Sequence, residues 1–324
     1  MPPTVPSRGP SEPGEGGRAS VARDYPSPKA LLERHGLRPK KSWGQNFLCD
    51  PGALEHIAEL ASPGPGEAVV ELGAGLGHLS ARLWARGAAV VAVERDRDMA
   101  RVLRAELGEK ILVLEADAAR LDWPGLAARY GRPETPAGRP RLLVVGNLPY
   151  HLTSPILFAL LETAPWLSRA VFLVQREVAE RLAAAPGARG HGLLSVLLQR
   201  QADVEVARRV PPGAFWPPPR VESAVLCARF RPPEDPVIDE GRFRALVKAG
   251  FGQRRKTLRN ALQAARVATA KDLDAALTRA GLDPARRGES LSLSEWAALE
   301  RALGPTAASN NTTGARPLNP VPAR

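Results

Sequence analysis

Two kinds of hydrophobic pattern alternate along most of the chain. Short apolar runs rich in β-branched residues predict strands, at 68–72, 89–93, 110–114, 141–145, 170–174, 203–210 and 221–230. Stretches with apolar positions at helical spacing predict helices, at 29–35, 51–61, 78–86, 96–108, 153–164, 176–185 and 193–201. Strands that alternate with helices predict an α/β domain with a doubly wound, Rossmann-like sheet.

Beyond a proline-rich linker at 231–236, the strand pattern stops. Helices are predicted at 240–250, 253–267, 271–280 and 294–303. A small all-helical domain is therefore expected at 237–304, after an α/β domain at 25–230. The ends of the chain, 1–24 and 305–324, have the composition of disordered tails.

The charge balance favours a polyanionic partner. The chain carries 45 Lys and Arg against 34 Asp and Glu, a formal net charge of +11. Between 242 and 260 there are cations and no acid: Arg242, Arg244, Lys248, Arg254, Arg255, Lys256 and Arg259. Charge runs are usually solvated faces, but an uncompensated one beside an α/β domain favours contact with nucleic-acid phosphates. The candidate contacts are Lys40, Lys41, Lys248, Arg254, Arg255, Lys256 and Arg259.

Other compositional features argue against several classes of protein. The two cysteines, Cys49 and Cys227, are far apart and have no metal-ligand spacing, so neither a disulfide framework nor a metal site is expected. Few cysteines suit a reducing, cytoplasmic location. No apolar run approaches the roughly 18 residues of a spanning helix, and the N-terminus lacks the apolar core of a secretory signal.

A glycine-rich loop follows the first predicted strand. Its glycines, Gly73, Gly75 and Gly77, allow backbone amides to approach a ligand at a helix N-terminus. His78 occupies the position where a dinucleotide fingerprint requires its last glycine, which disfavours an NAD-dependent dehydrogenase. The pattern Glu71-x-Gly73-x-Gly75 instead resembles the first motif of class I S-adenosylmethionine (AdoMet) methyltransferases.

Carboxylates end the next two strands. Glu94 lies about twenty residues beyond the glycines, where a carboxylate suits a ribose diol. Asp117 follows the third strand, where it could accept a hydrogen bond from an adenine amino group. Acids at strand-to-helix junctions are also common helix caps, but the two matching positions together favour ligand binding.

The fourth strand ends abruptly in Asn147-Leu148-Pro149-Tyr150. The amide of Asn147 stands at a strand end where open α/β sheets bind ligands, and Pro149 turns the chain out of the ladder. Tyr150 adds an aromatic face. Acceptors beside an aromatic plate suit a planar amine such as adenine, although a plain turn with a buried tyrosine has the same pattern. Phe215, in the rigid loop 211–220, could supply a second plate.

Taken together, these motifs resemble the rRNA adenine N6-dimethyltransferase family, and within it the KsgA/RsmA (small-subunit rRNA) branch. The resemblance covers about residues 30–303. It is carried by the motifs Gly-Gln-Asn-Phe-Leu at 44–48, Glu-Leu-Gly-Ala-Gly at 71–75, Asn-Leu-Pro-Tyr at 147–150, Phe-x-Pro-Pro-Pro-x-Val-Glu-Ser at 215–223 and Phe-x-Gln-Arg-Arg-Lys-Thr-Leu-Arg-Asn at 251–260.

The resemblance implies a cofactor, a catalytic set and a substrate. AdoMet would be held by Asn46, Leu48, Gly73, Glu94, Asp117 and Asn147. Catalysis would use Asn147, Leu148, Tyr150 and Phe215. The substrate would be two adjacent adenosines near the 3′ end of small-subunit (16S) rRNA, modified during ribosome biogenesis by a monomer that binds the small ribosomal subunit.

Two features depart from the family pattern: 151–154 is His-Leu-Thr-Ser where Asn-Ile-Ser-Thr is usual, and Ala74 replaces a common proline. Thr153 and Ser154 are still expected to cap the helix that follows with a hydroxyl, and neither change touches the proposed acceptors. The closest alternative is an Erm-type large-subunit rRNA methyltransferase, disfavoured by the 253–260 signature and by Leu148. A DNA adenine methyltransferase would more typically show Asp- or Asn-Pro-Pro-Tyr. A catalytically idle assembly or transcription factor would be expected to have damaged AdoMet residues.

Overall fold

The computed structural model describes residues 15–40, 43–64, 67–133, 138–253 and 255–304, in two compact units. Unit 1 comprises residues 1–184 and 197–233, and unit 2 comprises 185–196 and 234–324. The segment 185–196 therefore groups with the helical part of the chain, although the expected boundary lay at 230. Within unit 2, Gly187 N–H donates to the Glu289 carbonyl (2.8 Å), and the His191 ring lies 6.3 Å from that of Phe251.

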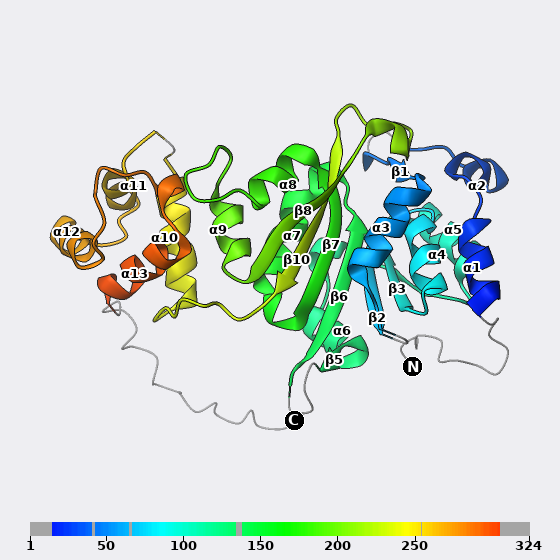
Figure 1. Cartoon of the computed structure of the whole chain (residues 1–324), viewed down its shortest axis with the longest axis horizontal. Coiled ribbons are helices and arrows are strands. Elements are labelled where there is room, and N and C mark those ends of the chain that lie inside the picture. Colours follow the sequence, from blue (N-terminus) through cyan, green and yellow to red (C-terminus); the bar gives the residue numbers. More distant parts are fainter. Residues whose placement is uncertain (1–14, 41–42, 65–66, 134–137, 254, 305–324) are drawn as a thin grey trace, which may run out of the picture. The chain divides into compact units, whose positions relative to one another are not determined.

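Unit 1 contains a mixed sheet with the strand order β4-β3-β2-β6-β7-β10-β8 (Figure 1). Its strands are β2 (Ala68–Leu72), β3 (Ala89–Glu94), β4 (Leu112–Glu115), β6 (Pro140–Asn147), β7 (Leu167–Gln175), β8 (Ala202–Val210) and β10 (Ser223–Phe230). The strands from β4 to β7 are parallel, and β10 is antiparallel to both β7 and β8. The short β5 (Arg132–Pro133) pairs with the start of β6. All seven strands predicted from the sequence are present.

Helices precede and separate the strands along the chain. They are α2 (Pro28–Arg34), α3 (Pro51–Ala61), α4 (His78–Ala85), α5 (Arg97–Leu107), α6 (Trp123–Tyr130), α7 (Thr153–Glu162), α8 (Arg176–Leu182) and α9 (Leu193–Gln199). In the main core, α3 and α4 pack against strand residues such as Val69, Val90 and Val145. Helix α6 was not predicted, although its Asp122 cap and Pro124 form an ordinary helix start.

The N-terminal prediction is wrong for part of the expected tail. Residues Glu15–Arg23 form helix α1, which packs against α4. Ala22 is buried, Val21 packs against the main core, and the Arg18 guanidinium lies over the Trp84 ring. Composition concealed this because the segment combines glycine, serine and arginine with few apolar residues. The rest of the two expected tails, 1–14 and 305–324, lies outside the described residues.

A two-stranded sheet joins the motif at 44–48 to the rigid loop 211–220. Strand β1 (Phe47–Leu48) pairs antiparallel with β9 (Phe215–Trp216), with Phe47 opposite Trp216 and Leu48 opposite Phe215. The Ala214 carbonyl also accepts the Cys49 amide (2.9 Å). These bonds fix the Gly-Gln-Asn-Phe-Leu segment against the proline-rich loop.

Unit 2 is built from α10 (Glu240–Phe251), α11 (Leu258–Ala264), α12 (Ala270–Arg279) and α13 (Leu293–Leu303). Helix α11 starts later than predicted, because the Thr257 hydroxyl accepts the Asn260 amide and caps it. Gly250 of α10 lies so close to Trp296 of α13 that an added Cβ would overlap the indole ring. Helices α10 and α13 can therefore pack this closely only with glycine at position 250. Across the described parts of both units, no helix is long and apolar enough to span a membrane.

Candidate cofactor and substrate site

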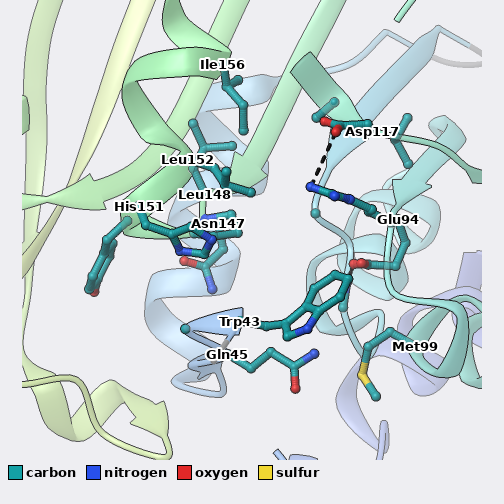
Figure 2. A pocket seen from close by; sticks show the side chains of 18 of the residues that line it. Trp43, Gln45, Glu94, Met99, Asp117, Asn147, Leu148, His151, Leu152 and Ile156 are labelled. Carbon is teal, nitrogen blue, oxygen red and sulfur yellow. Dashed lines mark hydrogen bonds and ion pairs between the residues drawn. The ribbon is translucent and has the colours of Figure 1, made fainter. Parts of the chain in front are cut away.

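A cavity of about 240 Å³ opens at the carboxyl ends of β2, β3, β4 and β6 (Figure 2). This position is the switch point of the sheet, where the chain order reverses between β2 and β6. Seven of the predicted site residues line it, namely Asn46, Gly73, Glu94, Asp117, Asn147, Leu148 and Tyr150. The structure thus brings together residues from four strand ends and from the segment before β1.

The glycine loop is held by the carboxylate of Glu94. Gly73 and Gly75 have φ values of +69° and +57°, which side chains rarely adopt. The Gly75 amide donates to Glu94 Oε2 (2.8 Å), and the Asp96 amide donates to Oε1 (2.7 Å). Burial raises the pKa of Glu94, against the opposing effect of these donors. The Arg95 amide is a third backbone donor to this carboxylate, and a carboxylate has about four acceptor sites, so Glu94 can still accept a hydrogen bond from a ribose hydroxyl.

His78, which departs from a dinucleotide motif, has a structural partner. Its Nε2 lies 3.0 Å from the Pro26 carbonyl and therefore donates to it, and the Tyr25 ring meets the imidazole edge-on. Burial lowers the pKa of His78 to about 4, so the ring is neutral at physiological pH. The Tyr25 hydroxyl donates to the Leu76 carbonyl (2.8 Å), which ties residues 25–26 to the glycine loop.

Asp117 both caps a turn and lines the cavity. Its Oδ1 accepts the Ala119 amide (3.0 Å) at the start of a 3₁₀ helix, Ala118–Arg120. Its Oδ2 lies 3.4 Å from Arg95 Nη1, the contact drawn in Figure 2. The sequence left open whether Asp117 caps a helix or binds a ligand, and its position in the structure allows both. Glu94, by contrast, caps no helix, because Asp96 is the N-cap of α5.

The side-chain amide of Asn147 is held in one orientation. Its Nδ2 donates to the Asn46 carbonyl (2.9 Å). Because a carbonyl only accepts, this bond uses the donor end of the amide and leaves Oδ1 as an acceptor. The Leu148 amide donates to the Leu173 carbonyl (3.1 Å) and extends the ladder one residue past the strand.

The Tyr150 ring is anchored by its hydroxyl. Its oxygen lies 2.6 Å from the hydroxyl of Ser223, which is fully buried at the start of β10. Burial raises the pKa of Tyr150. The expected Thr153 cap is wrong, since its hydroxyl donates to the Pro149 carbonyl (3.3 Å) and α7 has no side-chain cap.

Two predicted residues do not line the cavity. Leu48 and Phe215, each 4 % exposed, lie opposite one another in the β1–β9 pair and belong to the main core. Strand pairing buries the ring of Phe215 in this structure, and its role as a second aromatic plate stays a prediction. Leu48 contributes by holding Asn46, two residues earlier, at the cavity wall.

Several cavity residues were not selected from the sequence. Trp43, Gln45, Arg95, Met99 and His151 all line the cavity. Gln45 lies inside the motif at 44–48 that carries the family resemblance, which was a usable signal; Arg95 follows directly after Glu94. Trp43, which is 39 % exposed, gave no such signal.

The RNA-contact predictions are only partly compatible with the structure. Lys40 is paired with Asp96 and Asp98, and Arg259 with Asp274 (2.6 and 2.8 Å). Arg242 is likewise paired with the buried Glu300. The expectation of an uncompensated segment is therefore wrong for Arg242 and Arg259, whose acidic partners are remote in the sequence. Three predicted cations are exposed without an ion pair among the described residues: Lys248, Arg255 and Lys256. Lys41 and Arg254 lie outside the described residues.

The donor set of the cavity suits AdoMet. Carboxylates at two strand tips can bind the ribose and adenine, the glycine loop offers backbone amides, and Met99 and Ile156 provide apolar wall. Among the described residues, no group of three or more His, Cys, Asp or Glu could hold a metal ion. The strand order, glycine loop and strand-end acids together define a class I AdoMet-dependent methyltransferase.

Comparison with known proteins gives the family. The family model for ribosomal RNA adenine dimethylase matches residues 36–301, and the chain belongs to this family. It is 69 % identical over 280 residues to Ribosomal RNA small subunit methyltransferase A of Anaeromyxobacter sp. (strain K), covering 86 % of this chain and 99 % of the relative. The protein of that name from Myxococcus xanthus is 51 % identical, with 88 % and 98 % covered.

The fold is also found in solved structures. The crystal structure of 23S rRNA methyltransferase ErmE superposes with a TM-score of 0.59 at 27 % sequence identity. The match covers 80 % of this chain and 99 % of that one.

Proposed function

We propose that this protein uses AdoMet to dimethylate N6 of two adjacent adenosines near the 3′ end of small-subunit (16S) rRNA, during ribosome biogenesis. The observation that carries the proposal is the orientation of Asn147, which lines the cavity together with Tyr150 and whose donor end is held by the Asn46 carbonyl, so that Oδ1 is left to accept. Family membership and the names of the two relatives support the choice of RNA and subunit.

The target adenine must leave its stack before its amino group can enter the site. The face of Tyr150 would stack on the extruded base, a contact worth about 1–3 kcal/mol. Ser223 holds that ring by its hydroxyl, so less rotational freedom is lost when the base binds.

Two acceptors would then bind the amino hydrogens. Asn147 Oδ1 takes one and the Leu148 carbonyl takes the other, which draws the nitrogen lone pair out of conjugation with the ring. When bound, AdoMet supplies an electrophilic methyl carbon on its sulfonium. Positive charge that develops on N6 is stabilised by these fixed acceptors rather than by a strong base. The methylated nitrogen loses a proton readily, and its remaining N–H allows a second transfer.

RNA binding would use the exposed cations of unit 2. Lys248, Arg255 and Lys256 carry charges with no ion pair among the described residues, so each can neutralise a phosphate. The partner is the small ribosomal subunit with its rRNA, and we expect the protein to act in the cytoplasm as a monomer.

The proposal is tested by supplying radiolabelled AdoMet with under-methylated small subunits, large subunits, naked rRNA and DNA. The product is then mapped by digestion and mass spectrometry. Label is expected on dimethyladenosine in small-subunit RNA and is expected to vanish with Asn147→Ala. Label confined to large-subunit RNA, as the name of the ErmE structure would suggest, or to DNA would refute the substrate assignment.

A further inference from the structure

A network of hydrogen bonds joins Lys40 and Gln45 to the turn after β3. The Lys40 ammonium donates to Asp96 Oδ1 (2.7 Å) and Asp98 Oδ2 (2.8 Å). The Gln45 side chain donates through Nε2 to Asp96 Oδ2 (2.8 Å) and accepts the Lys40 amide through Oε1 (2.8 Å). Asp96 is 2 % exposed, so both of its oxygens depend on these donors and on the Asp98 amide.

The network continues into the cofactor cavity. The Asp96 amide donates to Glu94 Oε1, and Glu94 Oε2 accepts the Gly75 amide. A continuous chain of hydrogen bonds therefore runs from Lys40 to the carboxylate that would bind the ribose and on to the glycine loop. Because Asp96 is buried, loss of its partners would move the turn that carries Glu94.

The residue after Gln45 is hydrogen-bonded to the side chain of Asn147. Asn46 follows directly after Gln45, and its carbonyl accepts Asn147 Nδ2. Lys40 and Gln45 are thus bonded to the turn beside the proposed ribose carboxylate, and Asn46 is bonded to the amide proposed to bind the substrate. Trp43 lies on the cavity wall near Gln45 (Figure 2). The Lys40 ammonium lies 5.6 Å and the Arg95 guanidinium 5.7 Å from the centre of its ring.

We propose that Lys40 and Gln45 are positioning residues for AdoMet, which hold Glu94 and Asn46 in place, and that Lys40 does not contact RNA. The inference rests on the proposed use of AdoMet. A lysine that binds phosphate needs a free ammonium. The ammonium of Lys40 instead lies between two carboxylates, which compensate its charge.

The test compares Lys40→Met with wild type in three measurements. Calorimetric titration without RNA gives the Kd for AdoMet, turnover at saturating AdoMet gives kcat, and RNA binding is followed against salt. Removing two charge-assisted hydrogen bonds is expected to raise the AdoMet Kd about tenfold. The salt slope of RNA binding is expected to be unchanged. The kcat at saturating AdoMet is expected to fall by a smaller factor than the affinity, because the β1–β9 pairing still holds Asn46 against Asn147.

Matched variants separate positioning from folding and from bulk charge. Lys40→Arg keeps a cation that can bridge both acids and is expected to restore most of the affinity. Lys29→Met removes an exposed cation elsewhere and is expected to change none of the three values. Gln45→Glu places a carboxylate against Asp96 and is expected to raise the AdoMet Kd. If Lys40→Met does not fold, Gln45→Met carries the same comparison, since it leaves both lysine pairs intact.

An unchanged AdoMet Kd in folded Lys40→Met or Gln45→Met would overturn the inference. So would a salt slope for RNA binding that falls by about one in Lys40→Met. Failure of the wild-type protein to bind AdoMet would instead overturn the proposed function, and the two failures are therefore distinguishable.

Discussion

A buried carboxyl group, Glu71, lies two residues before the glycine loop. Its protonation should make the free energy of unfolding depend on pH. Glu71, in the middle of β2, is 2 % exposed and is paired with the hydroxyl of Ser80 on α4. Burial raises the pKa of Glu71 to about 8, with a further contribution from Glu94. In the unfolded chain the same group titrates near its ordinary value of about 4.3.

The sign of the effect follows from proton binding. Between about pH 4.5 and the raised pKa of about 8, the folded protein holds a proton on Glu71 that the unfolded chain has released. Its contribution to the free energy of unfolding therefore falls as the pH rises, by about 1.4 kcal/mol per pH unit. Glu71→Gln keeps the shape and a hydrogen bond to Ser80 but removes the titration. Relative to this variant, wild type should lose about 2.5 kcal/mol between about pH 5 and pH 7.

The assay is urea unfolding followed by circular dichroism at several pH values, with the difference between the two proteins plotted against pH. Glu33→Gln, at an exposed position on α2, reports the effect of removing a carboxyl group from the surface. A difference between wild type and Glu71→Gln that stays constant from about pH 5 to pH 7 would show that Glu71 is ionised in the folded state, and the reasoning would fail.

Three further predictions concern the substrate side. Asn147→Ala should lower kcat by about 10²–10³ while Tm changes little, and Asn147→Asp should be nearly as slow because it loses the donor to the Asn46 carbonyl; wild-type turnover in either variant would exclude the acceptor role. Ser223→Ala and Tyr150→Phe should each lower kcat/KM about tenfold, and the double variant no further; additive losses would mean that the hydroxyl pair does not position the ring. Removing the charges of Arg255 and Lys256 together should reduce the salt slope of RNA binding by about two, and an unchanged slope would place the phosphate contacts elsewhere.

The strand and helix order could be predicted because it depends on local periodicity, and the acids at strand tips could be predicted because parallel strands end at one edge of the sheet. Phe215 could not be placed in the same way. Its burial depends on pairing with Leu48, far away in the sequence, which no local pattern reveals. The same limit applies to charge, since Arg259 looked uncompensated until the fold brought Asp274 beside it.

The motif at 44–48 links the part of the cavity proposed to bind the cofactor with the part proposed to bind the substrate. An amine substrate requires an acceptor at Asn147, but an unrestrained amide could equally present its NH₂ group, which would repel the substrate amine. The Asn46 carbonyl removes that choice by accepting Nδ2. Its own position is set on one side by the β1–β9 pairing and on the other by Gln45 and Asp96. The chemistry proposed for Asn147 therefore depends on a segment about a hundred residues away in the sequence, which is also the segment that meets the cofactor side of the cavity.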